Sequence, residues 1–292
     1  MKLIITIPAY NEEKSLGQVI DSIKPVLKEL KEETQILVVD DGSTDKTSKV
    51  AKEHDAIVVS HQINQGLASA FRTAVKKSLD LGADIIINFD ADGQYLAKEI
   101  PLLLNEIKKG NDLVLGSRFK GTIEQMPLMK RLGNILFSRV ISKIVNYKVS
   151  DCQTGFRAYN RKVAENIKLI SNFTYTQEQI IKAVHAGFKI KEVPVYFAKR
   201  EGESRLMKNP FDYAIKAWIN IFRIYRDYDP IKFFGKIGLS FFSIGFIIGL
   251  FLVYKFIKTG IIGHIPLTIL SLLFIIIGIQ IIIFGFLADM RG

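Results

Sequence analysis

Two long stretches near the C-terminus carry no charged side chain, and they constrain the fold more than any other part of the sequence. They run from 237 to 254 and from 265 to 287. Each is long enough, at about 1.5 Å per helical residue, to cross a hydrocarbon layer about 30 Å thick. A buried helix pair of a soluble protein is the alternative, but uncharged runs of this length are hard to bury. We therefore expect a membrane anchor at 233–292, a helical hairpin with transmembrane helices at about 235–257 and 264–287.

The formal net charge of +11 at pH 7 indicates an anionic partner. Cationic residues beside a membrane span favour the cytoplasmic side, and they suit anionic lipid or phosphate. We therefore expect a multi-pass protein of the cell membrane whose residues 1–232 form a cytoplasmic catalytic domain. A basic protein can also bind nucleic acid, but the sequence contains no recognised nucleic-acid motif, and we expect no such partner.

Short runs rich in β-branched residues alternate with amphipathic segments over the first 120 residues. The runs are 3–8, 35–41, 56–60, 84–92 and 112–118. The segments with helical signals are 12–30, 43–54 and 69–81. Near-continuous apolar strands separated by helices are typical of a parallel sheet covered on both faces. We predict an α/β fold, a Rossmann-like and mostly parallel sheet with flanking helices, which binds its ligands beyond the carboxyl ends of the strands.

Two basic amphipathic segments, 129–145 and 210–228, lie between this region and the apolar tail. Helices that mix aromatic, apolar and cationic side chains next to a span commonly lie in the membrane interface. Packing on the soluble core is the alternative for both segments, and it is as strong as the interfacial one for the first. We expect both helices to belong to the domain 1–232.

The residues DADGQ at 90–94 directly follow the fourth apolar run. Two carboxylates at i and i+2, Asp90 and Asp92, converge on one cation where the chain bends, and Gly93 gives the chain freedom to bend. A Mg²⁺ or Mn²⁺ ion that bridges a diphosphate needs only one or two protein carboxylates. An ordinary turn is the alternative, which the position after a buried strand disfavours.

Polar residues also follow the first two runs, as PAYNE at 8–12 and DDGSTD at 40–45. An acidic side chain at a strand end can accept a hydrogen bond from a ribose hydroxyl or a base N–H, and Tyr10 can stack on a base. A turn followed by a helix cap explains the residues 41–43 equally well.

These motifs, together with NQGLASA at 64–70 and GSRF at 116–119, resemble in order and spacing the family-2 inverting glycosyltransferases of the GT-A nucleotide-sugar fold. The residues SDCQTGFRAY at 150–159 and FAKREGESRL at 197–206, followed by apolar helices, are similar to the polyprenyl-phosphate branch of that family, the dolichyl-phosphate mannose synthase-like enzymes. The resemblance covers roughly residues 1–230 closely and the tail only in kind.

The resemblance implies transfer of a hexosyl group from a nucleotide sugar, of the GDP-mannose or UDP-glucose type, to a polyprenyl (dolichyl) phosphate. It implies that the nucleotide sugar is bound by Pro8, Ala9, Tyr10, Glu12, Asp40, Asp41, Asp90, Ala91, Asp92 and Gln94. It implies that Mg²⁺ or Mn²⁺ is held by Asp90, Asp92 and Gln94. It implies that the acceptor phosphate is bound by Arg118, Arg131, Arg200, Ser204 and Arg205, and that the catalytic residues are Asp92, Arg118, Arg131 and Arg200.

Other functions stay open on the sequence. A processive polysaccharide synthase typically carries a QxxRW motif and more spans, whereas Trp218 stands in KAWIN. A transferase acting on a hydroxyl of a lipid-linked glycan requires a general base, and a non-catalytic membrane scaffold predicts loss of the metal carboxylates. For Arg157 and Asp151 a structural salt bridge and acceptor contact are both open, and we expect the four histidines to be structural or solvated. A homo-oligomer is compatible with all of these functions.

Overall fold

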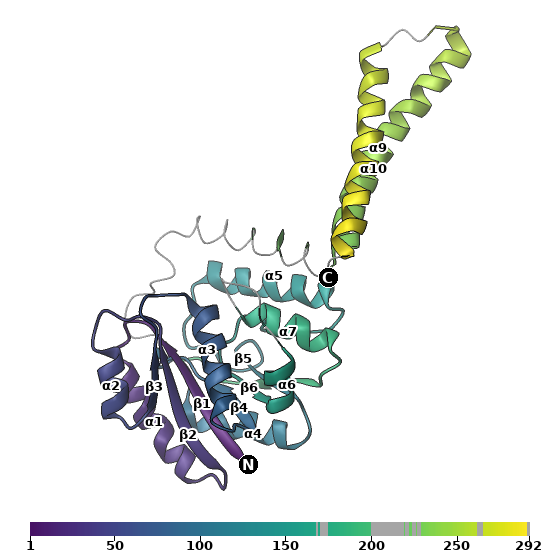
Figure 1. Cartoon of the computed structure of the whole chain (residues 1–292). Helices are drawn as coiled ribbons and strands as arrows, with labels where there is room; N and C mark the ends of the chain where they lie inside the picture. The colour runs from purple at the N-terminus through teal and green to yellow at the C-terminus, as the bar shows by residue number, and fades with distance from the viewer. Residues whose placement is uncertain are drawn as a thin grey trace. The chain divides into compact units, whose positions relative to one another are not determined.

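The computed structural model of the chain describes residues 1–167, 169, 175–199, 219, 222, 223, 226, 229–261 and 265–290 (Figure 1). It forms two compact units, Met1–Lys208 and Asn209–Gly292. The first unit contains the α/β sheet and the second contains the two long apolar helices.

A seven-stranded sheet in the order β3-β2-β1-β4-β6-β5-β7 forms the centre of the first unit (Figure 1). Its strands are β1 (Lys2–Ala9), β2 (Glu33–Asp40), β3 (Ile57–Ser60), β4 (Ile85–Asn88), β5 (Leu113–Ser117), β6 (Arg157–Asn160) and β7 (Ile190–Pro194). β6 is antiparallel to both neighbours, and every other pair is parallel. This confirms the predicted mostly parallel sheet. The fourth apolar run differs at its end, because β4 stops at Asn88 and the chain turns before 92.

Helices cover the sheet and match the predicted segments closely. They are α1 (Leu16–Lys28), α2 (Thr47–Glu53), α3 (Leu67–Asp80), the 3₁₀ helix η1 (Ala97–Glu99), α4 (Ile100–Lys108), α5 (Leu128–Ile144), α6 (Arg161–Asn166) and α7 (Thr176–His185). Buried residues of α1 recur every three or four positions, and they join alternate β1 residues such as Leu3, Ile5 and Ile7 in the main apolar core. α1 begins later than predicted because the Glu12 carbonyl first accepts the amides of Ser15 and Leu16 in a turn.

The order of the strands fixes where a ligand can bind. From β1 the chain passes to β2 and then to β3 on one side, and it returns to β4 on the other side of β1. Neighbouring strands that leave β1 in opposite directions open a crevice beyond their carboxyl ends. The motifs at 8–12 and 90–94 follow β1 and β4, so they lie at this crevice.

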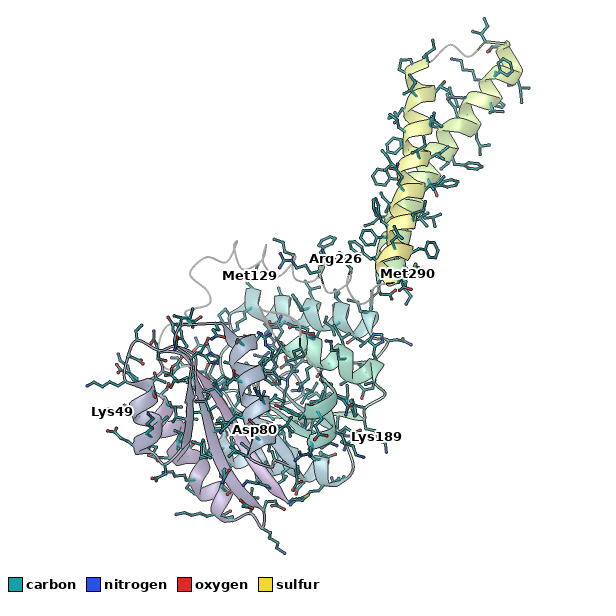
Figure 2. The ribbon with its side chains drawn as sticks, in the orientation of Figure 1. Lys49, Asp80, Met129, Lys189, Arg226 and Met290 are labelled. Carbon is teal, nitrogen blue, oxygen red and sulfur yellow. The ribbon has the colours of Figure 1, made fainter. Side chains whose placement is uncertain are left out.

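α5 has an inner face that packs and an outer face that does not. Phe137 and Ile141 are buried on the inner face. The outer face exposes 55–75% of four large apolar residues, Leu128, Met129, Leu132 and Leu136 (Met129 is labelled in Figure 2). The helix predicted at 129–145 is therefore present. Most of the segment 210–228 lies outside the described residues, although 219, 222, 223 and 226 are helical.

The second unit is a hairpin of α9 (Pro230–Thr259) and α10 (Ile265–Asp289), both long and apolar enough to cross a membrane by length and composition. Small buried residues recur every seven positions along each helix, including Gly238 and Gly245 on α9 and Ser271 and Gly278 on α10. A Cβ atom added to Gly238 would come within 2.6 Å of the Gly278 carbonyl oxygen. The Ser271 hydroxyl donates to the Gly245 carbonyl at 2.7 Å. These close contacts confirm the predicted two-helix hairpin, and they explain its glycines, because small residues let helix backbones approach each other closely.

Candidate functional site

The turn after β1 and the turn after β2 hold each other in place. Asn11, with φ at +53°, donates its amide to the Ser43 hydroxyl at 2.9 Å and accepts the Thr44 amide at 2.7 Å. The Glu12 amide donates to the Thr47 hydroxyl at 2.8 Å. Asparagine tolerates this left-handed backbone better than most residues. Tyr10, one position earlier, stays 39% exposed at the crevice, so its ring is accessible.

Asp41 joins the end of β2 to the loop after β3. Its Oδ1 accepts the Gln65 amide at 3.0 Å and lies 2.6 Å from Nδ1 of His61, and its Oδ2 accepts the Gly66 amide at 2.8 Å. Nε2 of His61 lies 2.8 Å from the hydroxyl of Thr73 on α3. Both carboxylate oxygens of the buried Asp41 are therefore engaged within the protein.

Among the described contacts, Asp40 uses one carboxylate oxygen, whereas Asp41 uses both. It is buried at the end of β2, paired in register with Ala9, and its Oδ1 accepts the Ser43 amide at 3.0 Å. Gly42 follows with φ at +71°, and an added Cβ there would collide with the backbone of Ile63. The loop after β3 thus packs directly on the turn after β2.

Asp90 and Asp92 lie half-buried in the turn that follows β4. Gly93 takes φ at +72°, and the Gln94 amide donates to Oδ1 of Asp92 at 3.2 Å. The residues that the structure describes contain no group of three or more His, Cys, Asp and Glu side chains able to hold a metal ion. Two carboxylates suit an ion whose remaining ligands come from a diphosphate and water.

Gly155, although distant in the sequence, packs closely against the side chain of Asp90. A Cβ atom added to Gly155 would lie 2.7 Å from Oδ2 and 2.8 Å from Cγ of Asp90, and closer still to Oδ1. The Gly155 amide donates to the hydroxyl of Tyr95 at 3.4 Å. The motif at 150–159 therefore forms one wall around the first carboxylate of the motif at 90–94, and only glycine leaves room for it.

Gln94 is tied to the segment after β7 by a pair of hydrogen bonds. Its side-chain Nε2 donates to the Ala198 carbonyl at 3.0 Å, and the Ala198 amide donates to the Gln94 carbonyl at 2.8 Å. Gln94 is buried, and its Oε1 accepts no hydrogen bond from the described residues. These two hydrogen bonds join the motif at 90–94 to Ala198, near the start of the motif at 197–206.

Arg118 forms a buried ion pair with Asp151. The Arg118 Nε and Nη2 donate to the two carboxylate oxygens at 2.6 and 2.8 Å, and its backbone amide donates at 3.1 Å. Burial alone would lower the pKa of Arg118, but the charge of Asp151 raises that pKa above its ordinary value. The family resemblance implies that the Arg118 charge faces a phosphate. In the structure that charge is compensated by Asp151, and the pair links the end of β5 to the segment carrying Gly155.

Within the described part of the chain Asp151 pairs with Arg118 rather than with Arg157, so the expected salt bridge between Arg157 and Asp151 is not formed. Its guanidinium is fully buried and donates to the carbonyls of Thr154, Thr176 and Cys152 at 2.6–2.9 Å. Burial lowers the pKa of this guanidinium. Arg157 therefore holds three backbone segments together.

The other predicted site residues are distributed as follows. Pro8 and Ala9 end β1, Ala91 is buried between the two carboxylates, and the Glu12 side chain accepts the Ser15 hydroxyl at 2.9 Å. Arg131 lies exposed in the first turn of α5, and no contact in the described part of the chain joins it to the carboxylates. Arg200, Ser204 and Arg205 lie outside the described residues.

His61 has the structural role expected of the histidines, and its contact with Asp41, like the contacts of Gly155 and Ala198 with the motif at 90–94, was not expected. His61 follows β3, which pairs in register with β2 so that Ser60 stands beside Asp40. That register is the signal that could have brought His61 to Asp41. Gly155 and Ala198 lie in the motifs at 150–159 and 197–206, but only long-range pairing brings them to the motif at 90–94.

Comparison with known proteins identifies the family of the chain. The family model described as glycosyl transferase family 2 matches residues 4–168. The chain is 33% identical over 209 residues to a dolichyl-phosphate hexose transferase of Haloferax volcanii, covering 72% of this chain and 87% of that protein. It is 32% identical over 292 residues to a dolichol-phosphate mannosyltransferase of Pyrococcus furiosus, covering 94% and 78%.

Solved structures share the fold. Glucosyl-3-phosphoglycerate synthase from Mycobacterium tuberculosis matches with a TM-score of 0.60 and 19% identity, covering 75% of this chain and 79% of that chain. The same enzyme has been solved with Mn²⁺ and uridine diphosphate. The fold is thus the predicted GT-A type, and the chain is a glycosyltransferase that belongs to glycosyl transferase family 2.

Proposed function

We propose that the protein transfers a hexosyl group, with inversion, from a nucleotide sugar of the GDP-mannose or UDP-glucose type to a polyprenyl phosphate. The observation that carries this proposal is the similarity to a dolichyl-phosphate hexose transferase over 72% of the chain. The alignment with the dolichol-phosphate mannosyltransferase covers 94% of this chain and so extends into the apolar tail. A lipid acceptor also fits a chain with two helices long enough to span a membrane.

We assign the nucleoside to the crevice beside β1 and β2. Tyr10 offers an exposed ring for stacking, and among the contacts of the described residues one oxygen of the Asp40 carboxylate accepts a backbone amide. Asp41 supports the site indirectly, because its two oxygens hold the loop at 64–66. Pro8, Ala9 and Glu12 form the adjoining wall.

We assign Mg²⁺ or Mn²⁺ to Asp90 and Asp92, with Oε1 of Gln94 as a further oxygen ligand. The donor set is oxygen only, which suits a hard divalent ion, and Gly155 keeps the space beside Asp90 clear. Such an ion, when bound, neutralises charge on the leaving nucleoside diphosphate. Gln94 orients its carboxamide through Ala198, so that its oxygen rather than its nitrogen is left for the ion.

The acceptor needs cations more than it needs a base. A phosphate monoester, with a second pKa of about 6, is largely dianionic at pH 7 and can attack the anomeric carbon without losing a proton to the protein. Arg131, Arg200, Ser204 and Arg205 are our candidates to bind it and offset repulsion between two anions. Arg118 acts as a positioning residue, because its ion pair with Asp151 fixes the segment that borders Asp90.

We propose that residues 1–232 lie on the cytoplasmic side and that 233–292 anchor them. The exposed apolar outer face of α5, flanked by Arg131 and Arg139, suits the interface between lipid and water. The glycine-lined hairpin of α9 and α10 supplies the anchor.

The test is transfer of radiolabelled sugar by the full chain in detergent, from a panel of GDP- and UDP-sugars, with Mg²⁺ or Mn²⁺. Polyprenyl phosphate is compared with the matching polyprenol and with a lipid-linked monosaccharide. Asp92→Asn is expected to abolish transfer. Asp80→Asn, the same change at the exposed C-terminal end of α3 (Figure 2), is expected to retain it.

Label on polyprenyl phosphate alone, dependent on metal and Asp92, supports the proposal. Label on the lipid-linked monosaccharide instead would assign a hydroxyl acceptor. No transfer from any donor, by a chain that melts cooperatively, would refute the proposal.

A further inference from the structure

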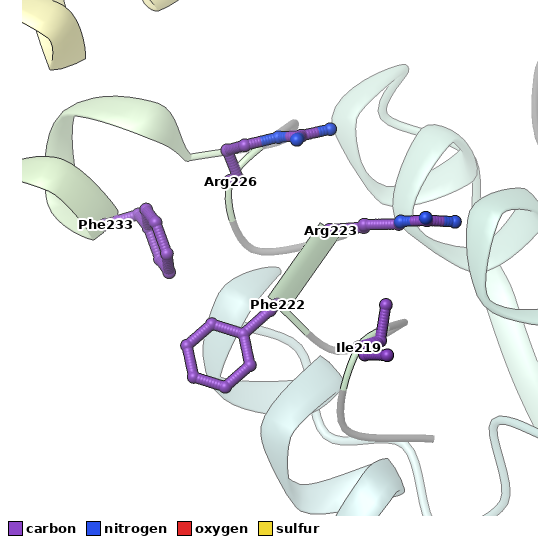
Figure 3. Close-up of a pocket in the computed structure, with 5 residues that line it drawn as sticks. All are labelled: Ile219, Phe222, Arg223, Arg226 and Phe233. Carbon is purple, nitrogen blue, oxygen red and sulfur yellow. The ribbon is translucent and has the colours of Figure 1, made fainter. Parts of the chain in front are cut away.

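One carboxamide, that of Gln280 on α10, lies within the two uncharged runs of the second unit. Arg223 and Arg226 lie outside these runs, before α9, where they border a small apolar hollow with Phe222 and Phe233 (Figure 3). A carboxamide has two N–H donors and an acceptor oxygen. Gln280 is exposed, and no hydrogen bond from the described residues reaches its side chain.

Gln280 lies deep in the proposed membrane span. It is four residues from Ile276, the midpoint of 265–287, which is about 6 Å along a helix. The hydrocarbon core extends about 15 Å from its middle to its edge, so the residue lies roughly 9 Å inside that edge. Lipid chains cannot form hydrogen bonds, and a carboxamide left unpaired among them costs free energy. A partner with polar groups at the same depth is therefore favoured.

Gln280 faces away from α9. The buried residues of α10 are Ser271, Gly278 and Gly285, and all three pack against α9. Gln280 follows Gly278 by two positions, or about 200° around the helix axis, so it lies on the opposite side. The hairpin itself therefore does not satisfy the carboxamide.

The residues that share this outer face with Gln280 form a seam along α10. Together with Gln280 they are spaced alternately by four and three positions, and they are 42–54% exposed: Ile269, Leu273, Ile276, Ile283 and Leu287. This is the spacing of the contact positions in paired helices, where a single polar residue fixes register and the number of helices. The apolar residues suit lipid as well as a helix, so Gln280 is what favours a helix.

A second copy of the chain supplies the required partner at the required depth. All copies insert in the same direction, so α10 of a second copy carries its own Gln280 at the same level. Identical residues face each other across a twofold axis. Two facing carboxamides can exchange two N–H···O hydrogen bonds, because each has both a donor and an acceptor.

We infer that the protein forms a parallel homodimer in the membrane through this seam of α10, with the Gln280 carboxamides of the two copies hydrogen-bonded across the twofold axis. The inference rests on the proposed membrane anchor and does not depend on which sugar or acceptor the enzyme uses.

The experiment counts photobleaching steps of the full chain, labelled with one dye at its N-terminus and reconstituted into liposomes over a range of protein-to-lipid ratios. The wild type is expected to bleach in two steps at ratios where Gln280→Leu bleaches in one. Loss of one interhelical hydrogen bond in a membrane weakens association about three- to tenfold, and two are lost here. The dissociation constant of the dimer should therefore rise roughly 10- to 100-fold in Gln280→Leu.

The matched control is Thr268→Val, which removes a polar group from the same helix outside the seam. We expect it to dimerise as the wild type does. A monomeric wild type, or Gln280→Leu that dimerises equally well, would overturn the inference. Equal weakening in both variants would also overturn it, because the effect would then not belong to the seam.

Cross-linking tests the face of the helix in chains that keep Gln280. Ile276→Cys lies in the seam and Ile279→Cys lies outside it, at positions that are 42% and 43% exposed. The native Cys152 is buried and common to both variants. Oxidation in liposomes is expected to give several-fold more disulfide-linked dimer from Ile276→Cys, and equal or reversed yields would overturn the inference.

Both assays are independent of sugar transfer, so the two proposals fail separately. A wild type that transfers sugar but stays monomeric would overturn the dimer alone. A wild type that dimerises through Gln280 but transfers no sugar would support the dimer and refute only the proposed function.

Discussion

Replacing Gly155 by alanine should disable the enzyme without altering a single polar group. The backbone of Gly155 does not lie in the left-handed region, so alanine is sterically allowed there as far as the backbone is concerned. The added methyl group would stand 2.7 Å from Oδ2 of Asp90, where an ordinary contact needs about 3.4 Å. Because Oδ1 lies closer still, Asp90 must move by about 1 Å, since the wall behind Gly155 is main chain in the buried motif 150–159.

A displacement of this size is large for a group that positions reacting atoms. Misplacement by about 1 Å commonly costs around a hundredfold in rate. We expect kcat of Gly155→Ala to fall by roughly 30- to 100-fold, and the Mn²⁺ concentration for half-maximal activity to rise. The fold should persist, because the overlap involves one half-buried carboxylate rather than the apolar core.

The assay is sugar transfer to polyprenyl phosphate across a Mn²⁺ titration, with Gly133→Ala as the control. Gly133 lies within α5, and a Cβ atom added there meets nothing within 4 Å. That change should leave activity near wild type and stabilise the fold by about 0.5–1 kcal/mol, as alanine does for glycine inside a helix. Wild-type kcat and metal dependence in Gly155→Ala would refute the placement of the metal at Asp90.

Four further predictions follow from the same contacts. Asp151→Asn leaves the Arg118 charge buried and uncompensated, which should cost about 3–5 kcal/mol and lower Tm by roughly 10 °C; an unchanged melting curve would contradict the ion pair. His61→Ala should raise KM for the nucleotide sugar more than it lowers kcat, because the loop that Asp41 holds borders the donor; a change confined to kcat would argue against this. Gly245→Leu should destabilise the hairpin, because even an added Cβ would lie 2.7 Å from the Ser271 carbonyl oxygen of the facing helix; an unaltered melt in detergent would exclude the close packing. Burial raises the pKa of the Cys152 thiol to about 12, so Ellman's reagent at pH 8 should label it only after denaturation; rapid labelling of the native chain would show that the site opens.

The first half of the sheet was predictable because its signals are local. β1, β2 and β4 are short runs of buried, mostly β-branched residues, and each is followed by polar residues that cannot continue a buried strand. Position after a parallel strand was enough to bring residues 8–12, 40–45 and 90–94 to one crevice. The two apolar helices were predictable for the same reason, since their length and lack of charge need no partner to be recognised.

The second half was not predictable, because β6 is defined by its partners. It is four residues long, reads RAYN, and begins with a buried arginine. Only pairing with β4 and β5, about 70 and 45 residues earlier in the chain, makes it a strand. The contact of Gly155 with Asp90 depends on that pairing. So does the buried position of Arg157, which donates to backbone carbonyls while Arg118 pairs with Asp151.

These long-range contacts join parts of the site that lie far apart in the sequence. Gly155 limits where Asp90 can lie, and Gln94 is hydrogen-bonded to Ala198, near the start of the 197–206 segment. The resemblance assigns the residues 90–94 to the donor and metal and the segment 197–206 to the acceptor. Because both meet at Gln94, a donor that shifts the turn after β4 must also shift the start of the acceptor segment. The Michaelis constants for donor and acceptor should therefore change together in variants of this turn, and independent variation would mean that the hydrogen bonds of Gln94 break during turnover.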